Sequence, residues 1–215
     1  MKKFEQELDN LKQQVMKMGE VAEQMVIWAS DAMLERDRAI IQQVLTNEPL
    51  VDRFQIDIDH EAIRLITVYS PIAKDLRFLL MVARITTELE RIGDQALNNC
   101  EYVELLLSTP PPQPLLDLSK MAEITQTMVR DAMQAFLEED LERAQGVLRS
   151  DDEVDALNAQ TFRDLLTDTV EQDTINQCMI LILIARSLER IADHATNICE
   201  EVIYMVKGED IRHQT

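Results

Sequence analysis

The strongest constraint on the fold is an internal duplication of the chain. Residues 89–103 match residues 188–202 at 10 of 15 positions, at an offset of 99. Upstream of this segment the offset is 103, so that Asp37 corresponds to Asp140. A shared helical rhythm can reproduce apolar residues, but it cannot reproduce Glu, Arg, Asp, Asn and Cys at matching places. The chain therefore consists of two copies of one structural unit.

Each copy has the composition and the sequence pattern of helices. Only 4 of the 215 residues are glycine, and Leu, Ala, Glu, Met, Gln and Arg, which lose little rotamer freedom in helices, are abundant. No segment has the period of a strand convincingly. Asp37 and Asp140 are placed to cap the second helix of each copy. The six expected helices run over 4–35, 37–69 (broken near Pro49), 72–108, 116–138, 140–171 and 174–207.

Prolines divide the two copies. Residues 109–115 contain four prolines, and they cannot be helical because proline lacks the backbone N–H and restricts its predecessor. We expect a stiff linker there. The sequence thus predicts an all-α protein with one three-helix unit at 1–108, the linker at 109–115 and a second three-helix unit at 116–215.

The charge of the chain restricts its partners. The formal net charge is −19, with 40 acidic against 21 basic residues. A field of that sign repels phosphate backbones and anionic lipids, so we expect neither nucleic acid nor a membrane surface as partner. The longest apolar run, 179–185, is too short to span a bilayer. Three cysteines without close spacing and a start without an apolar segment favour the reducing cytoplasm.

The most informative polar pattern is an acidic stripe on the third helix of each copy. With Glu90 set at zero, the other stripe positions of the first copy fall within about 80°, while the apolar positions of that helix fall between about 200° and 280°. The stripe is therefore expected to lie opposite the core. Its members are Glu90, Asp94, Asn98 and Glu101 in the first copy and Glu189, Asp193, Asn197 and Glu200 in the second.

This geometry distinguishes between kinds of metal site. A ferritin-like centre needs inward carboxylates and Glu-x-x-His motifs, and the sequence has no such motif; Asp57-x-x-His60 is only a near match. Outward acids spaced like these repel one another, and a cation relieves that repulsion. Carboxylates with an amide suit Mg²⁺, Mn²⁺ or iron. The alternative is a solvated face paired with arginines. Asp52 and Asp155 are further candidates, with helix capping the favoured role.

The repeated motif Leu-Glu-Arg-Ile-(Gly/Ala)-Asp-x-Ala-x-Asn-x-Cys-Glu resembles the PhoU family of phosphate-specific transport. Asp75-Leu-Arg77, the proline-rich centre and 200–204 are similar as well. The resemblance implies two three-helix bundles related by pseudo-twofold symmetry, with multinuclear iron or zinc at a Glu-x-x-x-Asp motif in each. Those ligands would be Glu90 and Asp94, and their counterparts Glu189 and Asp193. Many relatives carry a further acid where this chain has Gln55 and Asn158.

The resemblance also implies a role. It implies a non-enzymatic, homodimeric protein that damps phosphate uptake and starvation signalling by contacting the phosphate ABC transporter and a phosphate-sensing histidine kinase. A metal-free helical scaffold whose stripe pairs with a basic helix is the alternative. A metal-dependent hydrolase is a third hypothesis, and the lack of a general base argues against it.

Overall fold

The computed structural model describes residues 2–108, 116–167 and 172–208, and these residues form six helices and no strand. The predicted all-α class is confirmed. The expected linker at 109–115 lies outside the described residues. The helices are α1 (Lys2–Glu35), α2 (Arg38–Tyr69), α3 (Ala73–Leu107), α4 (Leu116–Glu138), α5 (Leu141–Thr167) and α6 (Gln172–Lys207).

The turn between the first two helices is built in the same way in both copies. Arg36 and Glu139, equivalent at the offset of 103, both adopt a left-handed backbone conformation with φ of 56° and 55°. The next residue then caps the following helix: Asp37 accepts from the N–H of Ala39 at 2.8 Å. Asp140 does the same for α5, accepting from Glu142 at 3.0 Å. Both predicted N-caps are confirmed.

The break expected near Pro49 is absent, because α2 continues through this residue as one helix. Proline cannot donate the hydrogen bond that would go to the carbonyl four residues earlier, at Leu45. Both residues lie on the exposed side of α2. Water can therefore solvate that carbonyl, and the helix continues through the proline.

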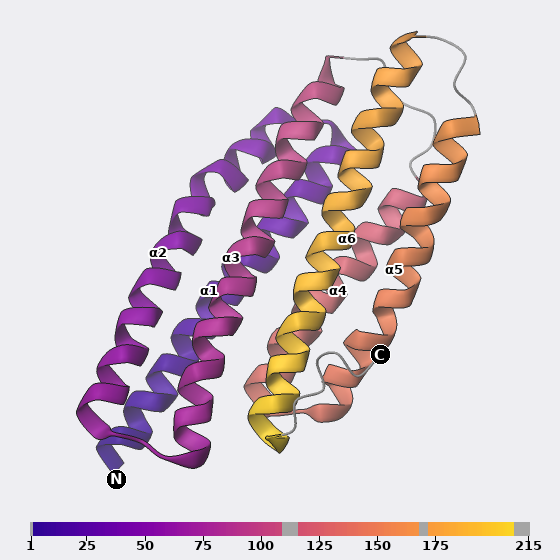
Figure 1. The fold of residues 1–215 in the computed structure, drawn as a ribbon. Coiled ribbons are helices and arrows are strands. Elements are labelled where there is room, and N and C mark those ends of the chain that lie inside the picture. Colours follow the sequence, from indigo (N-terminus) through magenta and orange to yellow (C-terminus); the bar gives the residue numbers. More distant parts are fainter. Residues whose placement is uncertain (1, 109–115, 168–171, 209–215) are drawn as a thin grey trace.

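The six helices form two layers (Figure 1). Helices α2, α3, α6 and α5 lie side by side in that order, and α1 and α4 lie behind them. Each copy is a three-helix bundle, and the copies meet where α3 packs along α6 and α1 touches α4. The buried aliphatic, methionine and alanine side chains of all six helices join into one core. This arrangement places the outer faces of α2, α3, α5 and α6 on one side of the molecule.

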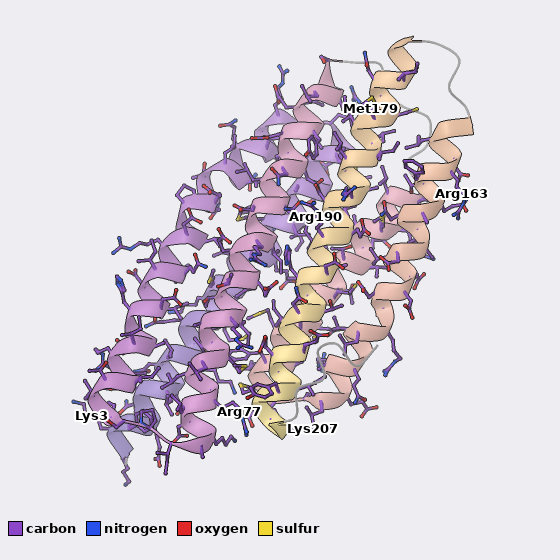
Figure 2. The ribbon with its side chains drawn as sticks, in the orientation of Figure 1. Lys3, Arg77, Arg163, Met179, Arg190 and Lys207 are labelled. Carbon is purple, nitrogen blue, oxygen red and sulfur yellow. The ribbon has the colours of Figure 1, made fainter. Side chains whose placement is uncertain are left out.

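Polar contacts fix α3 against α6 along the seam between the copies. Arg84 pairs with the nearly buried carboxylate of Glu201 at 3.2 Å. At the lower end of the seam, Arg77 donates from Nε to the carbonyl of Met205 at 2.9 Å, near the end of α6 that Lys207 marks (Figure 2). The two bundles are therefore held by directed bonds as well as by apolar packing. None of the helices in the described part of the chain is long and apolar enough to cross a bilayer.

Candidate functional site

Helices α2 and α3 bring four carboxylates together on the outer face of the first copy. We call Glu48, Asp52, Glu90 and Asp94 the first acidic cluster. Burial raises the pKa of Glu90, and the negative charges of Asp94 and Asp52 raise it further. Burial and the charge of Asp52 raise the pKa of Asp94 in the same way. Carboxylates that raise one another's pKa lie close enough to repel.

The second copy repeats this arrangement between α5 and α6. The second acidic cluster consists of Asp151, Asp155, Glu189 and Asp193. Burial, followed by the charges of Asp155 and Asp193, raises the pKa of Asp151 to about 6 from its ordinary 3.8. Oδ1 of Asp151 is buried and accepts no hydrogen bond within the described residues. This carboxylate is thus the most strongly perturbed member of either cluster.

Half of each cluster comes from the second helix of the copy. Glu48 and Asp151, which the sequence interpretation missed, are equivalent at the offset of 103 and stand one turn before Asp52 and Asp155. That repeated i, i+4 pair of acids was the signal that would have found them. The capping role favoured for Asp52 and Asp155 is wrong, because both lie well inside their helices.

The remaining residues of the two predicted stripes do not belong to the acidic clusters. Glu101 lines a groove between α2 and α3 together with Arg38. Asn197 turns toward the other copy, where its amide donates to Glu88 at 3.0 Å. Asn98 and Glu200 are partly exposed on their helices. Glu90, Asp94 and Glu189 are partly buried rather than fully outward, because the helix beside each of them covers one flank.

Asn158 and Gln55, the amides that stand where many relatives carry an acid, both donate hydrogen bonds. Asn158 donates to Oε2 of Glu189 at 2.8 Å, which fixes that carboxylate in the second cluster. Gln55 instead reaches Oγ1 of Thr87 at 3.5 Å and leaves Glu90 without the equivalent donor. The two clusters therefore differ in how their glutamate is oriented.

A buried polar contact lies between the two clusters at the α3–α6 seam. Oε2 of Glu88 lies 2.8 Å from Nδ1 of His194, and Arg91 approaches the same carboxylate at 3.6 Å. Burial alone raises the pKa of Glu88, but the hydrogen bonds from His194 and Asn197 outweigh it, and the net pKa is lowered. Glu88 is two residues from Glu90, and His194 follows Asp193. This contact therefore links the helices that carry the two clusters.

The donor atoms of both clusters suit a hard or borderline cation. Each offers four carboxylates and no thiolate or imidazole, and Oδ1 of Asp151 has no hydrogen-bond partner among the residues that the structure describes. Within the described residues, however, no three His, Cys, Asp or Glu side chains already converge closely enough to hold one ion. The clusters therefore match a cation in donor chemistry and charge, but not in the present placement of their side chains.

Comparison with known proteins assigns the chain to a family. The model of the PhoU domain matches twice, over residues 15–103 and 118–202. The chain belongs to the PhoU family. The PhoU homolog of Aquifex aeolicus, a phosphate-specific transport system accessory protein, is 37% identical over 99% of this chain and 96% of its own length. The accessory protein PhoU of Escherichia coli is 34% identical over 98% of this chain and 88% of its own.

Solved structures of PhoU proteins have the same fold. PhoU from Pseudomonas aeruginosa matches with a TM-score of 0.92 and 32% identity, covering 96% of this chain and 100% of that one. The regulatory protein PhoU from Streptococcus pneumoniae has a TM-score of 0.90 at 24% identity, covering 97% and 99%, and is similar in fold. The relatives from Aquifex aeolicus and Escherichia coli are named accessory proteins and the Streptococcus pneumoniae protein a regulatory protein, and none of these names is that of an enzyme.

Proposed function

We propose that the chain is an accessory protein of a phosphate transport system that restrains phosphate uptake and starvation signalling when phosphate is plentiful. The proposal includes contacts with the phosphate transporter and with a phosphate-sensing histidine kinase. It also includes a cytoplasmic location and a homodimer. The main support for this proposal is the similarity, over nearly the whole chain, to proteins named phosphate-specific transport system accessory proteins.

A genetic experiment tests this role. Deleting the gene should switch on phosphate-starvation genes in phosphate-rich medium, and a plasmid copy of the wild-type gene should silence them again. An alkaline phosphatase or promoter-fusion assay measures the response. If the deletion strain regulates these genes normally, the proposed role is refuted.

We further propose that each acidic cluster holds a metal ion or a small multinuclear centre. Iron and zinc are the ions that the family resemblance implies, and Mg²⁺ and Mn²⁺ are also compatible with oxygen ligands. Support comes from the mutual repulsion of the four carboxylates in each cluster, which a bound cation would remove. In the first cluster Glu90 and Asp94 would bind together with Asp52, and in the second Glu189 and Asp193 would bind together with Asp151.

Metal content distinguishes this proposal from a metal-free scaffold. Protein purified without chelator should contain metal by elemental analysis, and a Glu90→Ala plus Glu189→Ala variant should lose most of it. The matched control is Glu20→Ala plus Glu123→Ala, an equivalent pair of exposed acids on α1 and α4. The control should keep its metal. An unchanged metal content in the first variant would exclude the clusters as the binding sites.

A further inference from the structure

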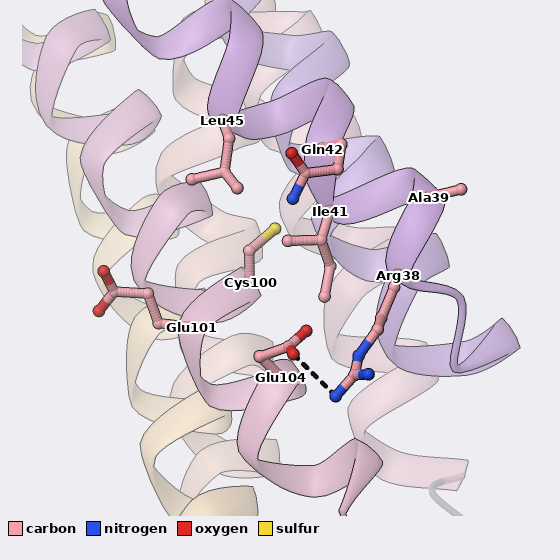
Figure 3. A pocket seen from close by; sticks show the side chains of 8 residues that line it. All are labelled: Arg38, Ala39, Ile41, Gln42, Leu45, Cys100, Glu101 and Glu104. Carbon is pink, nitrogen blue, oxygen red and sulfur yellow. Dashed lines mark ion pairs between the residues drawn. The ribbon is translucent and has the colours of Figure 1, made fainter.

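A groove with an apolar floor opens between α2 and α3 on the same face as the first acidic cluster. It has a volume of about 530 Å³. Figure 3 shows Ile41 and Leu45 of α2 pointing toward the buried Cys100 of α3. At one end, Arg38 pairs with Glu104 at 2.9 Å. The groove thus combines an aliphatic floor with a charged rim, as binding sites for apolar side chains do.

Exposed aliphatic side chains continue from this groove along α2. Leu45, Ile56 and Ile63 are 43%, 49% and 62% exposed. Their spacings of 11 and 7 residues place them within about 20° of one line on the helix. The line is about 27 Å long at 1.5 Å per residue. We call these three side chains the α2 stripe, and its seven-residue interval is the spacing at which a second helix makes repeated contacts.

The second copy differs from the first at the equivalent surface. Arg38 of the groove rim corresponds to Leu141, and Leu45 corresponds to Leu148. Both of these leucines are partly buried and pack against the core. Ile56 of the stripe is replaced by Ala159, which offers little apolar area. The two copies thus share their fold and their acidic cluster but differ at the rim of the groove and at position 56 of the stripe.

The surroundings of the groove and the stripe carry more carboxylates than cations, and Arg38 and Arg53 are already paired with Glu104 and Asp57. Glu101 and Glu104 border the groove, and Glu48 and Asp52 lie on α2 within one or two turns of Leu45. The whole chain carries a net charge of −19. A surface of aliphatic side chains among carboxylates is complementary to a helix with an apolar face flanked by Lys or Arg.

We propose that the groove and the α2 stripe are the docking surface for a basic amphipathic helix of the phosphate transporter. One large apolar side chain of that helix fills the groove, and the rest of its apolar face lies along Ile56 and Ile63. Its basic residues pair with the carboxylates of α2 and α3. This inference rests on the proposed function, since it names the surface through which the transporter is contacted.

The test measures binding of the full chain to the purified phosphate transporter of the same organism in detergent. An Ile56→Ser plus Ile63→Ser variant should bind at least about tenfold more weakly, because two apolar contacts are lost. The control is Met179→Ser plus Leu183→Ser, which removes two aliphatic side chains of α6 that are 58% and 38% exposed. Met179 lies near the start of α6, away from α2 (Figure 2). The control should bind like the wild type.

The outcomes separate the docking surface from the proposed function. If the wild type does not bind the transporter, both the proposed contact with the transporter and the proposed docking surface are refuted. If the wild type and the α2 variant bind equally well, only the docking surface is refuted. A photo-crosslinker at position 56 should attach to a transporter helix rich in Lys or Arg, and attachment to an acidic segment would overturn the inference. Light scattering should give the α2 variant the same mass as the wild type; a smaller mass would assign the stripe to a second copy of this chain.

Discussion

Replacing Asp151 by asparagine tests whether the second acidic cluster is under electrostatic repulsion. In the folded protein the pKa of Asp151 is raised to about 6, so its carboxyl keeps its proton at a pH where the unfolded chain has lost it. The folded state therefore binds more protons than the unfolded state between about pH 4 and pH 6. Without metal, the free energy of unfolding falls as the pH rises through that window. Asparagine has nearly the same shape and no charge, so the free energy of unfolding of the variant should not fall in this way.

The magnitude follows from the size of the shift. A change of about two pKa units corresponds to about 3 kcal/mol for a fully desolvated group. Asp151 is only half-buried, and water reduces the repulsion, so we expect the metal-free variant to be about 1–2 kcal/mol more stable at pH 7.5. For a chain of this length that is an increase of about 3–6 °C in Tm. At pH 4 the two proteins should have nearly equal stability.

Urea unfolding followed by circular dichroism, in EDTA at pH 4 and at pH 7.5, measures both differences. Asp9→Asn is the control, because Asp9 is an exposed acid on α1, outside both clusters. It should change the stability little at either pH. A variant at Asp151 that is less stable than the wild type at pH 7.5, or that gains equally at both values, would refute the electrostatic argument.

Four further substitutions probe the fold. Glu88→Gln weakens the 2.8 Å contact with His194 and should lower the free energy of unfolding by about 1–3 kcal/mol at pH 7, measured by urea unfolding. Because the pKa of Glu88 is lowered in the folded state, the difference from the wild type should shrink toward pH 3. Pro49→Ala restores a backbone donor inside α2 and should raise the unfolding free energy by about 1–3 kcal/mol in the same assay, whereas an unchanged value would mean that α2 has fully accommodated the proline. A Cβ at Gly19 would lie 2.5 Å from Met133, but one at Gly146 meets only an arginine tip at 3.8 Å. Gly19→Val should therefore lower the Tm and Gly146→Ala should raise it slightly, and the reverse order would contradict the packing of α1 against α4.

The sequence predicted the helices well because their signals are local. The caps at Asp37 and Asp140 and the scarcity of glycine determine where helices can run, and neighbouring residues suffice to recognise both. Pro49 was misjudged for a physical reason. A proline ends a helix when its lost hydrogen bond leaves a buried carbonyl unsatisfied, and exposure to water, which is a property of the tertiary structure, decides whether that happens.

The candidate site was predicted only in part because it is shared between helices. A projection of one helix shows that Glu90 and Asp94 avoid the core, but it cannot show which neighbour lies beside them. The packing of α2 on α3 supplies Glu48 and Asp52 and covers part of the stripe. The same limitation applies to Asn197, whose position on the helix matched the stripe although its amide bonds to Glu88 across the seam.

The duplication nevertheless contained the missing half of the site. The offset between the copies changes from 103 to 99 between the second and the third helix, because the position equivalent to Tyr69, the last residue of α2, is Gln172, where α6 already begins. The lost residues thus come from the end of the bundle, more than three turns away from Asp155. Shortening a helix at its end leaves the pairing of the remaining residues with the neighbouring helix unchanged. Glu48 with Asp151 is repeated at 103 one turn before Asp52 with Asp155, so the same helix packing places this pair beside the acids repeated at 99 on the third helix.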